Sequence, residues 1–491
     1  MKSNHDERRA HLPIAGEPLY ERLAEHYRRI IAAGTLVPGD RMPSVRALMD
    51  QHDVSLSTAL QTFRRLEDTG WLTAKPRSGY FVRRPAAAKL AALHEPEVPA
   101  LPPEAHYVGL HERVSRVIEL GHAHPGALNL GGATATAALY PSARLQALAI
   151  RTLRQRPTLL TEAGQDAGAI EYRQAAARRA LSFGVAVSPD EVLATSGGVD
   201  AVNLALRAVA RPGDTIAIES PAFFGLLQIL ESLGLRALEI PASPTTGLSL
   251  EALEIALSAY DTIKALVVVP NLQNPLGSIM PDERKAALVK LCARHGVAII
   301  EDDPYRELVD EADAARPIKA WDRDGGVIYC PSFNKVLAPG MRLGWMAAGR
   351  WHARARMLKF AQSRHNEALP QAVAADFLGS GAFDRHLRQL RERLRVQREQ
   401  TVDAIARHFP DETRLNAPPG GLLLWVALPE GARSEALFHA ALAEGIRVAP
   451  GAIFSNSDRF DAFVRLSCPR PFDQTMDAAF RTLGRLVREA G

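Results

Sequence analysis

Late in the sequence, a short polar stretch carries a lysine and an arginine directly after an apolar run. The run Val327–Cys330 predicts a buried strand, and the residues that follow it include Ser332, Asn334, Lys335 and Arg342. Sheets in which strands alternate with helices bind their ligands just beyond the carboxyl ends of the strands. A lysine amine can bind a carbonyl carbon as a Schiff base, and an arginine can bind a phosphate through two parallel hydrogen bonds. The stretch therefore predicts a ligand site.

Four further groups of polar, glycine or aromatic residues follow other strand-like runs. Taken singly, each has an ordinary explanation, such as a turn, a core side chain or a helix cap. Their shared position after apolar runs predicts that they meet at one edge of a parallel sheet. In chain order they are Ser196 with Gly197 and Gly198, then Phe223, then Asn274, and finally Asp302 with Tyr305.

Part of this set suits a phosphate and a flat ring. N–H groups at a glycine-rich helix start bind phosphates, and this is the context of Gly197 and Gly198. Ser332 and Arg342 can add side-chain donors to the same phosphate. Phe223 offers an aromatic face on which a planar ring can stack. A phosphorylated aromatic ligand is thus the first expectation.

The rest of the set suits the polar atoms of the ring. Asp302 can pair with a protonated ring nitrogen, while Tyr305 and Asn274 can donate hydrogen bonds to a ring hydroxyl. A ring of this kind next to Lys335 describes pyridoxal 5′-phosphate, an electron sink that needs a lysine and an acidic partner for its pyridinium nitrogen. We therefore predict this cofactor.

These motifs resemble those of the fold-type I aminotransferases from about residue 110 to the end of the chain. They are Asn274-Pro275-x-Gly277, Asp302-x-x-Tyr305, Ser332-x-Asn334-Lys335 and, seven residues after the lysine, Arg342. The resemblance implies that Lys335 carries the cofactor and then moves a proton. It also implies that Arg465, with Asn274, binds the α-carboxylate of a substrate or effector.

Apolar periodicity predicts the elements that position these residues. The runs 214–220, 263–270, 296–303 and 326–332 are typical of buried strands, and 198–210 and 281–296 are typical of helices. Their alternation predicts a large, mostly parallel α/β domain over 108–365. Near residue 366 the pattern changes to long helices such as 384–409, followed by the strand-like runs 420–428 and 446–451. This predicts a smaller α+β lobe over 366–491.

The first 84 residues differ from the rest in charge and pattern. They hold 14 Lys and Arg against 10 Asp and Glu, whereas the totals of 59 and 55 leave 45 of each for the other 407 residues. Apolar stripes predict three helices, with Leu19, Leu23, Tyr27, Ile30 and Ile31 in the first, Val45, Leu48 and Met49 in the second, and Leu60, Phe63 and Leu66 in the third, which Ser55 or Ser57 can cap. Two short β-type runs around residues 76–79 follow. The pattern predicts a winged helix-turn-helix over 15–84 and a proline-rich linker over 85–107.

A basic winged helix-turn-helix reads DNA with the second helix of its pair, although the same fold can also serve protein contacts. The stretch 37–82 resembles the GntR family of bacterial regulators, with Pro43-Ser44, Arg46, Ser55, Thr58, Leu66, Gly70 and Gly79 in matching places. The predicted DNA-binding residues are Ser55, Ser57, Thr58 and Gln61 on that helix, Arg46 on the helix before it, and Lys75, Arg77 and Gly79 in the wing.

A GntR-type reader joined to an aminotransferase-like body resembles the MocR/GabR-type transcriptional regulators. The resemblance implies a homodimer that binds a double-stranded DNA operator and senses an amine or amino acid by Schiff-base exchange at Lys335. The intact Lys335, Asp302, Arg342 and Arg465 leave open an active aminotransferase that carries a DNA-binding domain. A metabolic enzyme whose first domain serves protein contacts is a third interpretation.

The apolar runs, the first residues and the cysteines together predict where in the cell the protein is located. No apolar run approaches the roughly 18 residues of a membrane helix. The start "MKSNHDERRA" lacks the apolar core of a signal peptide. Cys292, Cys330 and Cys468 follow no metal or redox spacing, so we expect reduced core cysteines, no metal site and a cytoplasmic protein.

Overall fold

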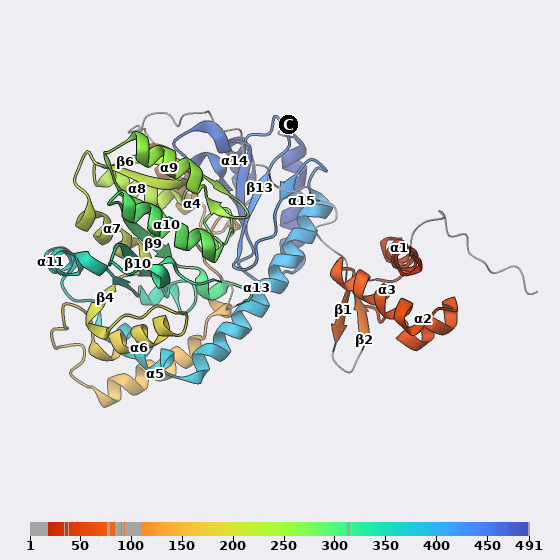
Figure 1. Ribbon diagram of the computed structural model, residues 1–491, viewed down its shortest axis with the longest axis horizontal. Coiled ribbons are helices and arrows are strands. Elements are labelled where there is room, and N and C mark those ends of the chain that lie inside the picture. Colours follow the sequence, from red (N-terminus) through yellow and green to blue (C-terminus); the bar gives the residue numbers. More distant parts are fainter. Residues whose placement is uncertain are drawn as a thin grey trace, which may run out of the picture. The chain divides into compact units, whose positions relative to one another are not determined.

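The computed structural model describes residues 18–33, 35–37, 39–75, 79–83, 90, 93, 110–311 and 315–489 (Figure 1). Backbone contacts divide the chain into two compact units, Met1–Ala88 and Lys89–Gly491. Each unit has its own hydrophobic core. The domain limits expected from the sequence, at residues 84, 107 and 365, stay predictions.

The first unit is a bundle of three helices with a β-hairpin. Its elements are α1 (Leu19–Ala32), α2 (Val45–His52), α3 (Leu56–Asp68), β1 (Leu72–Lys75) and β2 (Gly79–Val82), with the two strands antiparallel. Ser44 and Ser55 begin α2 and α3, because each hydroxyl accepts the backbone N–H three residues further on. The expected winged helix-turn-helix is therefore present.

Some residues of the predicted stripes are less buried than expected, and Ile30, Val45 and Met49 are half-buried. Leu23, Phe63 and Leu66 are buried as expected. Leu19 was expected on the buried stripe of α1 but is 43% exposed, since it stands at the helix start. The expectation for Leu60 was also too strong: it is only half-buried, because Ala59 takes the core-facing position on α3.

The second unit is built on an eight-stranded sheet of order β4-β11-β10-β9-β8-β5-β6-β7. Neighbours from β10 to β6 are parallel, whereas β11 is antiparallel to both its neighbours and β7 is antiparallel to β6. The four predicted strand runs form β5, β8, β9 and β10, which lie side by side and confirm a mostly parallel sheet. The strands are β4 (Val192–Thr195), β5 (Thr215–Ser220), β6 (Arg236–Ser243), β7 (Gly247–Leu248), β8 (Ile263–Val268), β9 (Ala298–Asp303), β10 (Val327–Pro331) and β11 (Gly344–Ala347).

Helices cover both faces of this sheet. Side chains alternate along a strand, so Ile216 and Ile218 of β5 pack in the core cluster that contains α7 and α8, while Ala217 packs in the cluster that contains α9 and α10. The predicted helices 198–210 and 281–296 are α7 and α10. The helices of this part are α5 (Ser142–Gln155), α6 (Ile170–Leu181), α7 (Gly198–Val209), α8 (Phe224–Ser232), α9 (Leu250–Ala259), α10 (Asp282–Arg294), α11 (His352–Gln362) and α12 (Ala368–Leu378).

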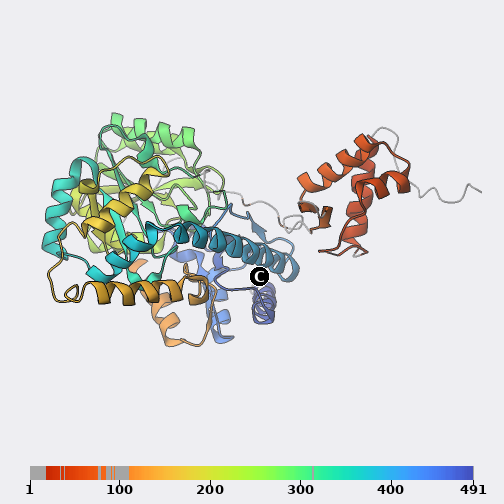
Figure 2. The same cartoon turned by 90° about the horizontal axis from the view of Figure 1, so that it is seen from below.

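A second, four-stranded antiparallel sheet of order β12-β13-β16-β15 lies in the C-terminal lobe, next to the 28-residue helix α13 (Figure 2). β3 comes from before the large sheet but pairs with β14, so the lobe also takes in a segment that precedes the large sheet. The elements are α4 (Leu110–Ala123), β3 (Leu128–Asn129), α13 (Gly381–His408), β12 (Arg414–Leu415), β13 (Leu423–Ala427), α14 (Ser434–Ala443), β14 (Ile446–Arg447), β15 (Ala449–Pro450), β16 (Phe463–Ser467) and α15 (Gln474–Glu489).

One residue of the predicted linker, Leu93, packs into the second unit. Its side chain is 8% exposed and belongs to that unit's core, and its N–H donates to the Asn416 side-chain oxygen at 3.2 Å. Leu93 lines a small slot together with residues that include Pro221, Leu276 and Trp425. The chain is thus anchored to the second unit shortly after it leaves the first.

Three features of the described residues bear on membranes, cysteines and metals. None of the helices described is both long and apolar enough to cross a membrane. Cys292, Cys330 and Cys468 are free and buried, as the sequence predicted. In the same residues, no group of three or more His, Cys, Asp or Glu is arranged to hold a metal ion.

Candidate functional site

Parallel strands bring the predicted ligand residues to one edge of the large sheet. Asp302 lies at the end of β9, and Lys335 follows β10. Asn274 follows β8, Phe223 caps α8 after β5, and Gly197 caps α7 after β4. Because β5, β8, β9 and β10 run in the same direction, their carboxyl ends open on the same side, as ligand sites of such sheets require.

Asp302 and Lys335 form the electrostatic centre of this edge. Burial raises the pKa of Asp302 to about 7, with a further rise from Asp303 and an opposing effect from Lys335. Burial also lowers the pKa of Lys335 to about 8, and Arg465 lowers it further. The Lys335 Nζ donates to the Thr134 hydroxyl at 3.1 Å. An amine of lowered pKa is present to a larger extent in its unprotonated, nucleophilic form at neutral pH, and a desolvated carboxyl favours a cation beside it.

The two acidic neighbours of Asp302 lie on the opposite face of β9, since successive side chains of a strand alternate. There Glu301 accepts the backbone N–H groups of Ile318 at 2.7 Å and Lys319 at 2.9 Å. Burial raises the pKa of Glu301 to about 8, and Asp303 raises it further. Three consecutive acids at the end of one strand are therefore separated into two environments.

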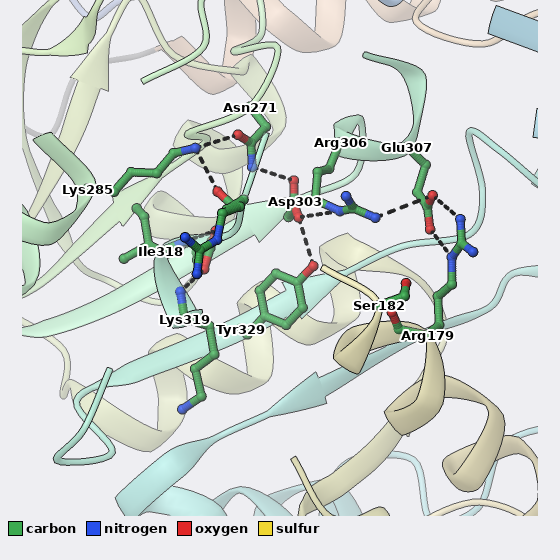
Figure 3. Close-up of polar contacts among 12 residues, drawn as sticks. Arg179, Ser182, Asn271, Lys285, Asp303, Arg306, Glu307, Ile318, Lys319 and Tyr329 are labelled. Carbon is green, nitrogen blue, oxygen red and sulfur yellow. Dashed lines mark hydrogen bonds and ion pairs between the residues drawn. The ribbon is translucent and has the colours of Figure 1, made fainter. Parts of the chain in front are cut away.

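Asp303 belongs to a buried polar network on that opposite face (Figure 3). It accepts the Tyr329 hydroxyl at 2.8 Å and the Asn271 amide at 3.4 Å. The oxygen of the same Asn271 accepts from the Lys285 ammonium at 2.9 Å, and that lysine is fully buried. The network satisfies the polar groups behind the site and fixes the end of β9.

The network continues toward α13 through a chain of ion pairs. Arg306 lies 4.0 Å from Asp303 and 3.3 Å from Glu307. Glu307 pairs with Arg179 at 2.6 Å, and Arg179 pairs with Asp384 of α13 at 2.7 Å. The end of β9 is thereby linked to the long helix of the C-terminal lobe.

Two glycines at the start of α7 leave space beside the predicted phosphate residues. Gly197 has φ +100°, and a Cβ there would lie 2.6 Å from the Asn334 side-chain nitrogen. A Cβ on Gly198 would lie 3.2 Å from Asp302 Oδ1. The Ser332 hydroxyl accepts the N–H of Asn334 at 3.3 Å. Any larger residue at Gly197 would be strained and would meet Asn334, which explains the glycine.

Arg342 and Ser196 meet at the same helix start. Arg342 Nη2 donates to the Ser196 carbonyl at 2.8 Å. The arginine has φ +48°, a left-handed backbone that is rare outside glycine and concentrates at functional sites. Ser196 donates its own N–H to Asp200 at 2.8 Å, and its hydroxyl accepts from Asn366 at 2.8 Å. The Ser196 N–H is thus engaged already, so the following glycines offer the backbone donors.

Arg465 lies at the centre of a second polar group. It is 2% exposed, and burial lowers its pKa to about 10. Its Nη1 donates to Asn274 at 2.8 Å and its Nη2 to the Gly131 carbonyl at 2.5 Å. Asn274 in turn donates to the Tyr305 hydroxyl at 3.4 Å, and burial raises the pKa of Tyr305 to about 12. The Nε of Arg465 is buried and has no partner in the described part of the chain.

Phe223 is half-buried and borders a cavity of about 200 Å³ together with Arg465. Its ring lies 4.9 Å from that of Phe224 at a 52° tilt. The predicted aromatic residue thus lies on the side of Arg465. The predicted ligand residues of the large sheet's edge thus face Arg465, which comes from β16 of the C-terminal sheet and contacts Asn274.

Sequence reasoning missed three residues of this site. Thr134 bonds Lys335 and Asn366 bonds Ser196, but both lie in irregular segments that carry no pattern. Glu219 lies at the end of β5 with one oxygen accepting the Val269 N–H at 2.8 Å, the other without a described partner, and burial raises its pKa to about 8. An acid inside an apolar strand was the available signal.

The predicted DNA-binding residues lie in the other unit, on one helix start and one hairpin. Ser55, Ser57 and Gln61 are exposed on α3, and Thr58 is half-buried there. The other described candidates, Arg46 on α2, Lys75 at the end of β1 and Gly79 at the start of β2, are also exposed. Lys75 lies 4.4 Å above the ring of Phe81. Arg77 lies outside the described residues.

The chemical groups that these residues present fit pyridoxal 5′-phosphate. A carboxyl of raised pKa at Asp302 suits a cationic ring nitrogen. The start of α7 and Arg342 suit a phosphate. The unpaired Nε of Arg465 suits a carboxylate. Lys335 supplies an amine whose pKa is lowered to about 8.

Comparison with known proteins gives the same two parts. Residues 140–483 match the aminotransferase class I and II family, and residues 19–82 match the gntR family of bacterial regulatory proteins. The uncharacterized HTH-type transcriptional regulator YjiR of Escherichia coli is 36% identical over 474 residues, covering 96% of this chain and 99% of its own. A second Escherichia coli regulator, YdcR, is 35% identical over 470 residues with the same shares.

A solved structure with the same fold is LysN, the α-aminoadipate aminotransferase of Thermus thermophilus, in complex with N-(5′-phosphopyridoxyl)-L-leucine. It is 27% identical, has a TM-score of 0.69 and covers 78% of this chain and 99% of its own. The second unit is thus a fold-type I transferase-like unit that depends on pyridoxal phosphate. The chain belongs to the MocR/GabR-type family of DNA-binding transcriptional regulators.

The raised pKa of Asp302 predicts how the cofactor-free protein responds to pH. The folded state holds the Asp302 proton more tightly than the unfolded state, so the stability it contributes is complete at acid pH and is lost as pH rises through about 7. Asp302→Asn removes this term, so its melting temperature falls less between pH 5 and pH 8 than that of the wild type. Glu219 and Glu301 have the same sign and leave a residual slope.

Asp324→Asn, at an exposed position, is the control and should keep the wild-type profile. Scanning calorimetry across this pH range measures the effect. Equal slopes for Asp302→Asn and the wild type would show that Asp302 is not held out of water as described.

Proposed function

We propose that the second unit senses an amine or amino acid, and that Lys335 is the residue through which it does so. The observation that supports this most directly is a lysine amine, with its pKa lowered to about 8, between Asp302 and Arg465. When bound, pyridoxal phosphate supplies an aldehyde carbon that takes one primary amine at a time. The amines of Lys335 and of an effector therefore compete for the same atom.

The other residues of the site bind and orient. Asp302 keeps the proton on the ring nitrogen, and Arg465 binds an effector's carboxylate. Because Asn274 bonds both Arg465 and Tyr305, it connects the carboxylate position to the ring hydroxyl. The proposed phosphate residues are Gly197, Gly198, Ser196, Ser332, Asn334 and Arg342, and Phe223 is proposed as the stacking partner of the ring.

The first unit reads DNA, and its proposed contacts are those predicted from the sequence: Arg46, Ser55, Ser57, Thr58, Gln61, Lys75, Arg77 and Gly79. The exposed start of α3 suits insertion into a major groove, and Lys75 at the hairpin suits phosphates. We propose a homodimer, because a two-fold pair of readers matches two half-sites of an operator. The cytoplasm, where the genome lies, is the proposed location.

A second function is an aminotransferase that carries a DNA-binding domain. The observation that favours it is that Lys335 interacts electrostatically with both Asp302 and Arg465, the acid and the arginine that transamination needs. A half-reaction followed by turnover with a keto acid at enzyme-like rates supports this alternative. Cofactor absorbance with a panel of amino acids measures it.

The experiment that tests the regulatory proposal measures operator affinity with and without amino acids in three proteins. DNA from upstream of the protein's own coding sequence serves as operator. In the wild type an effector shifts the affinity by about 5–150-fold, the range of ordinary coupling energies. In Lys335→Ala the operator affinity persists but the shift disappears, because no lysine amine remains to be exchanged.

Arg46→Ala is the matched variant in the other unit. It should lower operator affinity and reduce the slope of log affinity against log salt by about 0.9, the effect of one lost phosphate contact, while the cofactor spectrum stays unchanged. An unchanged effector shift in Lys335→Ala would rule out sensing through that lysine. An unchanged slope in Arg46→Ala would rule out this phosphate contact.

Leu93 offers a route from the ligand site to the linker. The slot that it lines includes Leu276, which lies within the Asn274-Pro275-x-Gly277 motif, and Trp425, whose cross-strand partner in the β13–β16 ladder is Arg465. A shift of Arg465 or Asn274 on binding a carboxylate would displace Trp425 or Leu276, since packed side chains have few alternative arrangements. We propose that Leu93 passes this change to the linker.

Leu93→Ala should therefore keep the operator affinity measured without effector. The ratio of operator affinities with and without effector should fall toward one. The reason is that the smaller side chain loses most of its contact with the slot, so the linker is no longer held to the ligand site. Leu181→Ala, at a leucine 64% exposed on α6, is the control and should respond as the wild type does. A full effector shift in Leu93→Ala, measured in the same operator titration, would exclude this route.

A further inference from the structure

The cavity next to Arg465 has an unusual balance of charge. It measures about 200 Å³ and has apolar walls from α4 and α8, including Val117, Ile118, Phe223 and Phe224. Two arginines, Arg447 and Arg465, and one histidine, His122, also line it. None of its lining residues is an aspartate or a glutamate. An apolar cavity that holds two guanidinium groups and no carboxylate attracts an anion.

Arg465 accounts for one of these charges. Its two terminal nitrogens are engaged by neutral oxygens, those of Asn274 at 2.8 Å and Gly131 at 2.5 Å, and its Nε is unpaired. Within the described residues Arg465 forms no ion pair, and its hydrogen bonds go to these two neutral oxygens. The first proposed anion, an effector's α-carboxylate, belongs here.

Arg447 is a second charge that the α-carboxylate does not use. It is half-buried in β14 beside Asn129 of β3, and only two residues further on Ala449 is the cross-strand partner of Arg465. Its Nη1 donates to the Gly121 carbonyl at 2.9 Å, in the last turn of α4. That contact is a helix-end interaction and occupies one of five N–H groups.

The helix-end contact does not explain why Arg447 faces the cavity without a counter-charge. Within the described parts of the chain it makes no ion pair, although most other partly buried arginines of the second unit pair with an acid. A guanidinium taken partly out of water is stabilised when an anion binds it, and a planar carboxylate matches its geometry. The position is therefore suited to an acidic group supplied by a ligand.

We propose that the cavity takes an amino acid with a second acidic group, the α-carboxylate on Arg465 and the distal acid on Arg447. The proposal rests on the proposed sensing function and narrows its effector class. The ring of Phe224, which lines the cavity, packs against the methylene groups between the two acids. Basic amino acids are repelled by the two arginines, and neutral ones leave Arg447 without an anion.

Pairs of ligands that differ only in charge test this inference. Calorimetry on the cofactor-loaded protein compares glutamate with glutamine, and aspartate with asparagine, and the cofactor's absorbance reports the same binding. In the wild type the acidic member of at least one pair binds about tenfold or more tightly, since a hydrogen bond between charged groups is worth that much more than a neutral one.

Two substitutions at Arg447 separate charge from shape. Arg447→Gln keeps a donor for the Gly121 carbonyl but loses the charge. The ratio of affinities for the acidic ligand and its amide therefore falls to about one, while the affinity for the amide ligand is unchanged. Arg447→Lys keeps the charge and much of the preference. Arg154→Gln, at an exposed arginine on α5, is the control for net charge and should behave as the wild type.

Each result decides between the two proposals. Equal binding of acid and amide in the wild type, or a preference that survives in Arg447→Gln, would overturn the assignment of the distal acid to Arg447. If amino acids of every charge fail to bind and leave the cofactor's absorbance unchanged, sensing itself is wrong, and the effector class is overturned with it. Tighter binding of lysine or arginine would also overturn the inference.

Discussion

The carboxyl of Asp302, taken out of water beside the amine of Lys335, is the constraint on which the rest of the second unit depends. Strand β9 ends in three consecutive acids, and alternation sends Glu301 and Asp303 to the face where backbone N–H groups, Tyr329 and Asn271 satisfy them. Asp302 remains on the ligand face with its pKa raised to about 7. A cationic ring is what this environment accepts most readily.

The same arrangement explains why two lobes are needed. The large sheet supplies the lysine and the acid, whereas Arg465 comes from β16 of the C-terminal lobe and reaches Asn274 after β8. A ligand that touches Lys335 and Arg465 together therefore bears on both lobes at once. It can change DNA binding only by the difference in its affinity for two arrangements, about 1–3 kcal/mol in most coupled systems. The slot that Leu93 lines is the place where we propose that such a difference reaches the linker.

Some of this could be predicted from the sequence because it follows local rules. Asp302, Asn274 and Lys335 follow apolar runs that were recognisable as strands, so their common edge was predictable. The parallel order of the four central strands followed from their alternation with helices. Ser55 and Ser57 were both candidate caps because of their residue type near the start of an apolar stripe, and the Ser55 hydroxyl has that role.

The rest depends on contacts between distant segments, which carry no local pattern. Thr134 bonds a lysine 201 residues away, and Lys285 is buried by groups that no periodicity connects to it. Arg447 resembles any charged residue at the end of a strand until β14 is paired with β3. Leu93 stands in a proline-rich stretch whose composition indicates a linker, and only the slot in the second unit shows that it is anchored.

The claim on which everything rests is that Lys335 is the protein's amine in a ligand-responsive cofactor site. Reduction of the purified protein with borohydride, which fixes the cofactor to its lysine, followed by peptide mapping tests it most directly. The account predicts a pyridoxyl group on Lys335 alone, and its loss when a bound effector amino acid occupies the site before reduction. A pyridoxyl group on another lysine, or full labelling of Lys335 in the presence of a bound effector, would contradict it.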